Sequence, residues 1–317
     1  MPHHRARPYG WDVRAHRRSP LALAALANAA VKGIEPVGTT ADDQPADDLD
    51  AALVEDTQTR RWVVRAPRTP MAAARLDAEA RLLVLLQGCL PFAVPDVAGA
   101  AQLPGGGHAV VHRELSGTVL HPGQLVPGPG LTASLGRAVA AIHDLPLRVI
   151  EDSGLPVYDA SEYRQRRLAE VDRAASTGKV PPRLLARWER ALEEVGAWKF
   201  VPSPIHGDLA AESVLVEGDQ VCGIIEWSEA RVADPADDLA WVAVGADADA
   251  LESVLEAYAL GRRESPDPDL ARRAQLAGEL AVARWLMHGV VADDPDIVDD
   301  AVGMLTTLEN AVADATW

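Results

Sequence analysis

The triplet His206-Gly207-Asp208 ends a proline-broken loop, VPSPIHGD, and precedes a short apolar run, SVLV. Glu226 follows at the end of a second apolar run, VCGIIEW, and Ser213 lies between the two carboxylates. Two strands joined by a tight turn bring their outer ends together, so Asp208 and Glu226 are expected to flank one site. A carboxylate that accepts a proton, beside two oxygen ligands for a metal, is what Mg²⁺-dependent phosphoryl transfer requires.

The spacing of these residues also resembles a known family. HGDLAAES resembles the catalytic loop H-G-D-x-x-x-x-N of the aminoglycoside phosphotransferase family, whose members are relatives of protein kinases. IIEWSEARVADPADDLAW resembles that family's metal-binding stretch, I-D-W followed by D-P-x-x-D-L-A. WVVRAPR, LPFAVPDV and EWSEARVADPADDLAW are similar to the macrolide phosphotransferase branch. The resemblance covers most of residues 35–245 in the family's order, which makes it far more specific than one triplet.

The resemblance implies a role for each residue that matches the motif. Asp208 would be the catalytic base that orients and deprotonates the substrate hydroxyl. Ser213 and Glu226 would be the ligands of Mg²⁺, at the positions where the family has Asn and Asp. His206 and Asp238 would tie the loop to the helix behind it.

Asp234 matches the first aspartate of D-P-x-x-D-L-A and would help set the turn before that helix. An aspartate before a proline is equally typical of a turn or helix cap with no part in a site, and the sequence favours neither alternative.

Kinase-like sites also need a cation on the third strand, paired with a glutamate on the next helix. None of the three lysines fits this position, and WVVRAPR places Arg65 there. Glu79 falls on the same stripe as three leucines of the helix expected at 69–87. A buried carboxylate requires a partner, so an Arg65–Glu79 pair is predicted over the alternative that Glu79 reaches solvent at the edge of the stripe.

The segment HREL, residues 112–115, follows a strand and precedes a Pro/Gly-rich crossing. By resemblance it is the hinge whose backbone would bind a purine base, which makes Arg113, Glu114 and Leu115 nucleotide-binding candidates. The resemblance implies ATP or GTP as the phosphoryl donor, and the sequence leaves both open.

The order of the elements predicts an α+β, two-lobe protein-kinase-like fold, with a small β-rich N-lobe and a larger, mainly helical C-lobe. Residues 1–19 are expected to form a flexible basic arm, residues 20–113 the nucleotide-binding lobe, and residues 114–317 the hinge and the catalytic and substrate lobe. Helices are predicted at the following ranges: 20–32, 69–87, 131–144, 160–175, 183–197, 235–245, 248–262, 268–291 and 295–313.

Four departures from the family pattern keep a second function open. Ser213 replaces Asn, Glu226 replaces Asp, and Arg65 replaces Lys. The loop TTADDQPADD, residues 39–48, has four aspartates and no glycine, whereas a phosphate-covering loop offers backbone N–H groups; it either repels triphosphate or points to solvent. The main hypothesis is a small-molecule kinase, and the alternative is a pseudokinase-like protein that binds a nucleotide or small molecule with weak or no transfer.

Composition limits the partners. The net charge is −17, and residues 201–317 hold 6 Lys and Arg against 24 Asp and Glu, which argues against nucleic acid. This acidic half would suit a cationic ligand or a solvated surface.

No run of 18 apolar residues is present, so no membrane span is predicted. Cys89 and Cys222 are expected to be reduced core thiols of a cytoplasmic protein.

The acceptor is expected to be a hydroxyl of a small molecule, such as a macrolide or a related antibiotic. Substrate choice is expected to lie in the helices after residue 245. The side chains that either line an apolar pocket or belong to the core are Trp241, Tyr258, Trp285 and Met287. The sequence leaves the acceptor and the oligomeric state open.

Overall fold

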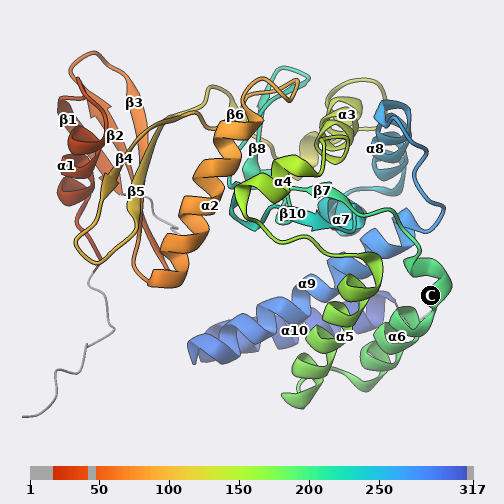
Figure 1. The fold of residues 1–317 in the computed structure, drawn as a ribbon. Coiled ribbons are helices and arrows are strands. Elements are labelled where there is room, and N and C mark those ends of the chain that lie inside the picture. Colours follow the sequence, from red (N-terminus) through yellow and green to blue (C-terminus); the bar gives the residue numbers. More distant parts are fainter. Residues whose placement is uncertain (1–16, 42–47, 313–317) are drawn as a thin grey trace, which may run out of the picture. The chain divides into compact units, whose positions relative to one another are not determined.

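A computed structural model describes residues 17–41 and 48–312 (Figure 1). The described chain forms two compact units, residues 17–84 with 95–114 and residues 85–94 with 115–312. Most of the predicted arm, and residues 42–47 of the aspartate-rich loop, lie outside the described residues. Residues 85–94 group with the second unit because Ala93 forms a parallel bridge with Gly223.

The first unit is built on a five-stranded antiparallel sheet with the order β1-β2-β3-β5-β4. Its strands are β1 (Pro36–Ala41), β2 (Leu49–Asp56), β3 (Arg61–Pro67), β4 (Val97–Gln102) and β5 (His108–Arg113). Strands β2 and β3 form an antiparallel hairpin, with Leu53 opposite Val63. Strand β4 was not predicted, because its sequence VAGAAQ lacks the β-branched and aromatic residues that mark a strand.

Two helices cover opposite faces of this sheet. Alternate residues of a strand point to opposite faces. Val54 and Val64 pack with α1 (Pro20–Ala30), whereas Val110 packs with Leu76 of α2 (Pro70–Leu86). Thr69 caps the start of α2, since the backbone N–H of Ala72 donates to its Oγ1 at 3.1 Å. The predicted buried stripe of α2 is confirmed by Leu76, Glu79, Leu83 and Leu86.

The second unit contains two short sheets. Strands β8 (Val214–Glu217) and β9 (Gln220–Ile224) form the predicted hairpin, and β6 (Thr118–Val119) pairs with β8. Strands β7 (Ser203–Ile205) and β10 (Arg231–Ala233) form a separate antiparallel pair. These last two have three residues each, too few for an alternating pattern to be recognised in the sequence.

Helices make up most of the second unit. Their bounds are α3 (Leu131–His143), α4 (Arg148–Ser153), α5 (Ala160–Ser176), α6 (Pro182–Glu193), α7 (Ala236–Gly245), α8 (Ala248–Gly261), α9 (Leu270–Ala292) and α10 (Pro295–Ala311). Only α4 was not predicted. A core of α5, α6, α9 and α10 surrounds Trp188, whose side chain is completely buried. The predicted fold class, a β-rich unit and a mainly helical unit, is confirmed.

One of the two cysteines lies outside the core, contrary to the prediction from the sequence. Cys89 is exposed rather than buried, because it lies just beyond the end of α2, after Gly88 turns the chain with φ +73°. Cys222 is half-buried.

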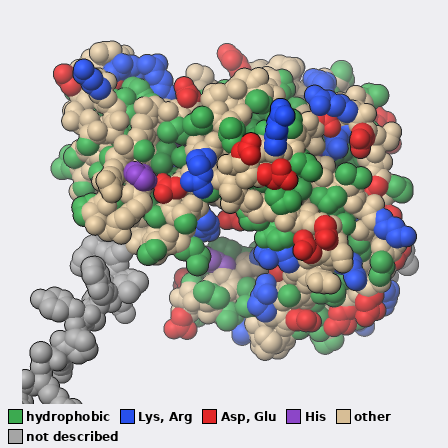
Figure 2. Space-filling model, viewed as in Figure 1, with side chains coloured by type: hydrophobic (Ala, Val, Ile, Leu, Met, Phe, Trp, Pro, Cys, Tyr) green, Lys and Arg blue, Asp and Glu red, His purple; other side chains and the backbone are tan. Residues whose placement is uncertain are grey.

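On the face shown in Figure 2, acidic side chains are interspersed with lysine and arginine. Within the described ranges, every helix is too short or too polar to cross a bilayer.

Candidate active site

Asp208 lies on the loop between β7 and β8, with an exposed side chain. The preceding residue, Gly207, has φ +87°, a conformation that favours glycine. A Cβ there would lie 2.2 Å from the carbonyl oxygen of Glu229 and 2.6 Å from Nη1 of Arg231. Glycine is therefore required before Asp208 for two reasons, its backbone conformation and the close approach of Glu229.

Asp238, in the first turn of α7, fixes the backbone of this loop. Its Oδ2 accepts from the N–H of His206 and its Oδ1 from the N–H of Gly207, both at 2.8 Å. Asp238 is completely buried, and Nε2 of His143 lies 3.1 Å from its Oδ2. Burial opposes ionisation, but the hydrogen bonds from His143 and the loop hold the pKa of Asp238 below its ordinary value. The carboxylate therefore remains an acceptor for the loop.

His206 connects the loop to the segment that carries Glu226. Its buried ring donates from Nε2 to the carbonyl oxygen of Ile225 at 2.8 Å. The ring also packs edge-on against Trp227, with centroids 4.8 Å apart. His206 thus contacts both residues that flank Glu226 and ties the Asp208 loop to that segment, while the prediction that Asp208 and Glu226 flank one catalytic site stays a prediction.

A charged group that the sequence analysis missed supports the same loop. Nη2 of Arg231 donates to the carbonyl oxygen of Gly207 and to Asp237, both at 3.0 Å. Asp237 also accepts from Nη2 of Arg167 at 2.6 Å and from the hydroxyl of Tyr163. Burial opposes ionisation of Asp237, but the two arginines lower its pKa to about 2. Arg231 and Asp237 lie inside the recognised motif, and only their position in a family pattern could have indicated them.

Asp234 anchors the start of α7 to α9. Its Oδ1 accepts from the N–H of Ala236 at 3.0 Å, which is the turn-setting contact that the sequence suggested. Its two oxygens also accept from Arg273, at 2.7 and 3.1 Å, in a pair that is almost completely buried. These contacts make Asp234 a support of α7, and thereby of Asp238.

The two predicted metal ligands differ in accessibility. Glu226 is exposed and has a left-handed backbone, with φ +68°. Ser213 is completely buried, and its Oγ donates to the carbonyl oxygen of Ala210 and accepts from the N–H of the same residue. The side chain of Glu226 is therefore accessible from solvent, whereas Oγ of Ser213 closes a turn; the role of both residues as metal ligands stays a prediction. Among the described residues, no three acidic, His or Cys side chains form a metal site by themselves.

The predicted ion pair of the first unit is present. Nη1 of Arg65 on β3 lies 2.7 Å from Oε1 of Glu79 on α2, and Glu79 is only 1% exposed. The other oxygen, Oε2, is buried with no hydrogen-bond partner in the described part of the chain. Glu79 therefore depends on Arg65 for charge compensation, while the part of this pair in nucleotide binding stays a prediction.

The three predicted hinge residues lie where the sequence passes from the first unit to the second. Arg113 stacks over Trp62 at 5.1 Å, and the backbone N–H of Glu114 donates to the carbonyl oxygen of Arg61 at 3.0 Å. Leu115 is half-buried and begins the long segment of the second unit. Their role in binding a purine stays a prediction.

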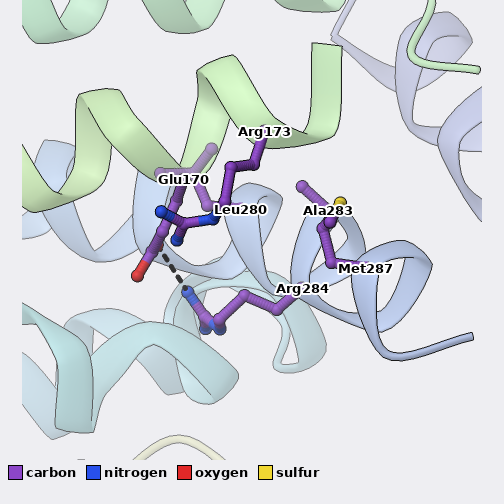
Figure 3. Close-up of a pocket in the computed structure, with 6 residues that line it drawn as sticks. All are labelled: Glu170, Arg173, Leu280, Ala283, Arg284 and Met287. Carbon is purple, nitrogen blue, oxygen red and sulfur yellow. Dashed lines mark ion pairs between the residues drawn. The ribbon is translucent and has the colours of Figure 1, made fainter. Parts of the chain in front are cut away.

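The candidates for an apolar substrate pocket lie in different environments. Tyr258 belongs to the core, where its hydroxyl lies 2.8 Å from Nδ1 of His143. Trp285 is 38% exposed and stacks on His288. Met287 lines a cavity between α5 and α9 (Figure 3).

Comparison with known proteins identifies the family of the chain. The phosphotransferase enzyme family (APH) matches residues 45–286, which is more than half of the chain. The chain belongs to this family. A relative of the chain is the uncharacterized protein YcbJ of Bacillus subtilis (strain 168), which is 27% identical over 199 residues. That match covers 60% of the chain and 65% of YcbJ, so the chain spans just under two thirds of that relative's length.

Solved structures of the same fold are similar over most of their length. The macrolide 2′-phosphotransferase MphH from Brachybacterium faecium, solved as the apoenzyme, is 25% identical with a TM-score of 0.77, over 90% of this chain and 98% of that one. A macrolide 2′-phosphotransferase type I is 29% identical with a TM-score of 0.74, over 90% and 96%. APH(2″)-IIia, solved with GDP and kanamycin, shares the fold at 21% identity, with a TM-score of 0.77 over 90% and 98%.

Proposed function

We propose that this phosphotransferase transfers the γ-phosphoryl group of a nucleoside triphosphate to a hydroxyl of a small molecule, with Asp208 as the catalytic base. The observation that carries the proposal is the geometry of the loop. Asp208 is exposed, while the two residues before it are held through their backbone N–H groups by the buried Asp238. A base that is fixed before the substrate arrives avoids reorganisation during the reaction.

In the proposed reaction, Asp208 accepts the proton of the acceptor hydroxyl. The hydroxyl oxygen forms a bond to the γ-phosphorus, the bond to the bridging oxygen breaks, and the nucleoside diphosphate leaves. Arg231 donates to the carbonyl oxygen of Gly207, and Asp238 accepts from the N–H of the same residue. The backbone of Gly207, which directly precedes Asp208, is therefore fixed at both of its polar groups. General-base assistance of this kind contributes roughly 10²–10⁴-fold in rate.

Glu226 is the residue that would hold Mg²⁺. Mg²⁺ is usually bound through one or two carboxylates with substrate phosphates and water, and it would neutralise charge on the phosphates. Ser213 would join Glu226 as a ligand, as the family pattern implies, only if the contacts of its Oγ with Ala210 opened. Glu226 is therefore the main ligand that we propose for Mg²⁺.

The names of the relatives support a nucleotide donor and an antibiotic-like acceptor. APH(2″)-IIia was solved with GDP and kanamycin, and two neighbours are macrolide 2′-phosphotransferases. Arg65, paired with Glu79, would be the cation that contacts the phosphates of ATP or GTP, and Arg113, Glu114 and Leu115 would border the purine. A guanidinium binds phosphate through two parallel hydrogen bonds, which suits Arg65 to this position.

Calorimetric titration of the full chain with ATP and with GTP, each with and without Mg²⁺, tests the donor site. Micromolar binding that depends on Mg²⁺ is expected for at least one nucleotide. Asp208→Asn should bind the same nucleotide within about twofold and lose phosphoryl transfer to hydroxyl acceptors by at least about 100-fold. Absence of binding for both nucleotides, or full transfer activity in Asp208→Asn, would overturn the proposal.

A further inference from the structure

A row of polar side chains leads from the end of α8 to the proposed catalytic loop, entirely within the second unit. Arg262, just after α8, pairs with Asp144 at 3.0 Å, and its Nη1 donates to the hydroxyl oxygen of Tyr258 at 2.8 Å. That oxygen lies 2.8 Å from Nδ1 of His143, the last residue of α3. Nε2 of the same ring lies 3.1 Å from Oδ2 of Asp238, which accepts from two consecutive N–H groups of the loop. His143 therefore connects α8 to the group that fixes the loop.

The two ends of this row determine which atom donates at each contact. A guanidinium can only donate, so the Tyr258 oxygen accepts from Arg262. The pKa of Asp238 lies below its ordinary value, so its carboxylate only accepts and Nε2 of His143 carries a proton. The hydroxyl proton of Tyr258 then has Nδ1 of His143 as its acceptor. The two neighbours of His143 thus select the Nε2–H tautomer of its ring.

The central groups of the row are shielded from solvent. His143, Tyr258 and Asp238 are all buried, and the His143 and Tyr258 rings pack edge-on with their centroids 5.4 Å apart. Water therefore cannot replace a missing donor at Asp238, and a buried carboxylate that loses a hydrogen bond is costly. With the donor from His143 in place, the two Asp238 oxygens receive three donors and the carboxylate is held in one orientation.

We infer that His143 is a positioning residue for the proposed phosphoryl transfer, which holds the Asp238 carboxylate through Nε2–H while Tyr258 orients its ring. The inference rests on the proposed function, because the effect of His143 on the rate is exerted through Asp208. His143 acts on the base through Asp238 and the backbone of the loop. Tyr258, which the sequence offered as a candidate for the substrate pocket, takes a supporting role in the core instead.

Two amide substitutions separate the two nitrogens of His143. Glutamine carries its amide nitrogen as many bonds from Cα as Nε2 of histidine, so His143→Gln keeps a donor for Asp238. Asparagine carries its amide at the distance of Nδ1, so His143→Asn keeps a polar group only towards Tyr258. The kcat should stay within about threefold of the wild type in His143→Gln and fall about tenfold or more in His143→Asn, while the KM for the nucleotide changes less than about twofold in both. Equal losses in the two variants, or a loss confined to the KM, would overturn the inference.

Leu305→Ala controls for a general loss of stability. Leu305 is a completely buried residue of α10, in the core around Trp188 and outside the row. Its truncation should lower the Tm at least as much as His143→Asn and leave kcat within about twofold of the wild type at a temperature where both variants are folded. A kcat that falls in step with the Tm across these variants would assign the effect to stability and overturn the inference.

Tyr258→Phe tests the orienting part. It removes the hydroxyl that contacts Nδ1 of His143, so kcat should fall about threefold in the wild-type background. The same substitution should have little effect in His143→Gln, which has no imidazole to orient. Additive effects of the two substitutions would show that Tyr258 does not act through His143 and would overturn this part.

NMR of the ¹⁵N-labelled full chain gives a readout that does not depend on turnover. The chain has nine histidines, and His143→Gln assigns the ring signals of His143. These signals should show the Nε2–H tautomer; an Nδ1–H tautomer would place a lone pair against the Asp238 carboxylate and overturn the inference. The amides of His206 and Gly207 should exchange with solvent about fivefold faster or more in His143→Asn than in His143→Gln.

The two kinds of readout keep this inference separable from the proposed function. If the wild type transfers no phosphoryl group while the tautomer and the amide exchange are as expected, the proposed function is lost and His143 remains a support of the loop. If the wild type transfers phosphoryl groups but the amides exchange alike in the two variants, His143 does not position the loop and the proposed function stands.

Discussion

The carboxylate of Asp238 accepts hydrogen bonds from the backbone N–H groups of His206 and Gly207, each at 2.8 Å. The two donors are consecutive, so one buried side chain fixes the peptide plane that leads into Asp208. The direction of the proposed base is thereby determined by α7, a helix that begins some thirty residues later in the sequence.

Asp238→Asn is expected to weaken this support. An amide offers one oxygen where the carboxylate offers two, so one buried N–H loses its acceptor, at a cost of about 2 kcal/mol in the free energy of unfolding. Phosphoryl transfer should fall at least tenfold. Urea unfolding and transfer assays measure both effects. Asp219→Asn, an exposed residue in the β8–β9 turn, should leave both unchanged; equal behaviour of the two variants would show that Asp238 does not hold the loop.

Gly207→Ala should displace the loop. The added Cβ would approach the carbonyl oxygen of Glu229 to 2.2 Å, and the backbone has φ +87°, so a loss of about 2 kcal/mol in stability or more is expected. Transfer should fall further than nucleotide binding, because the displaced residue precedes the base. Gly218→Ala in the β8–β9 turn is the control, since it has φ +57° but nothing within 4 Å of an added Cβ. Similar losses in both variants would assign the effect to backbone conformation alone.

Glu226→Asp should improve the use of Mg²⁺. The family pattern has Asp here, and Asp adopts the left-handed conformation of this position, with φ +68°, more readily than Glu. The Mg²⁺ concentration for half-maximal transfer should fall about threefold, equivalent to about 0.6 kcal/mol. Glu226→Gln should raise it instead. A metal dependence that is the same in the wild type and both variants would exclude Glu226 as a ligand.

The Asp237 carboxylate should make stability depend on pH in the acid range. Its pKa is lowered to about 2 in the folded chain, so its contribution is complete above the unfolded value of about 4 and is lost as pH falls from 4 towards 2. This contribution amounts to about 2 kcal/mol at neutral pH. Asp237→Asn should therefore lower stability at pH 7 and match the wild type more closely near pH 2. Asp172→Asn, an exposed residue of α5, should leave the pH profile unchanged.

Arg65→Gln should destabilise the first unit. It leaves the Glu79 carboxylate, 1% exposed, without its cation, and breaking such a pair typically costs about 3 kcal/mol or more. Arg65→Lys keeps the charge and should recover part of this loss. The double variant Arg65→Gln/Glu79→Gln should be more stable than Arg65→Gln alone. Thermal and urea unfolding measure the series, and additive effects of the two substitutions would argue against a coupled pair.

The sequence by itself determined much of this protein. Long apolar periodicities predicted eight of the nine expected helices to within three residues at both ends; the helix expected at 183–197 ends instead at Glu193, before a 3₁₀ turn. The stripe that contains Glu79 predicted its partner Arg65, because a buried carboxylate on an apolar face requires a cation. The H-G-D motif and the following D-P-x-x-D-L-A predicted the family.

Tertiary structure alone decided the rest. Strands of two or three residues, such as β7 and β10, form because distant segments pair, and their local sequence carries no period. Ser213 matches a ligand position in the sequence, yet its Oγ closes a turn on Ala210, since the packing of the loop decides where a side chain points. The arginines of the α5–α9 cavity are more than 100 residues apart, and only folding brings Arg173 and Arg284 to one apolar wall.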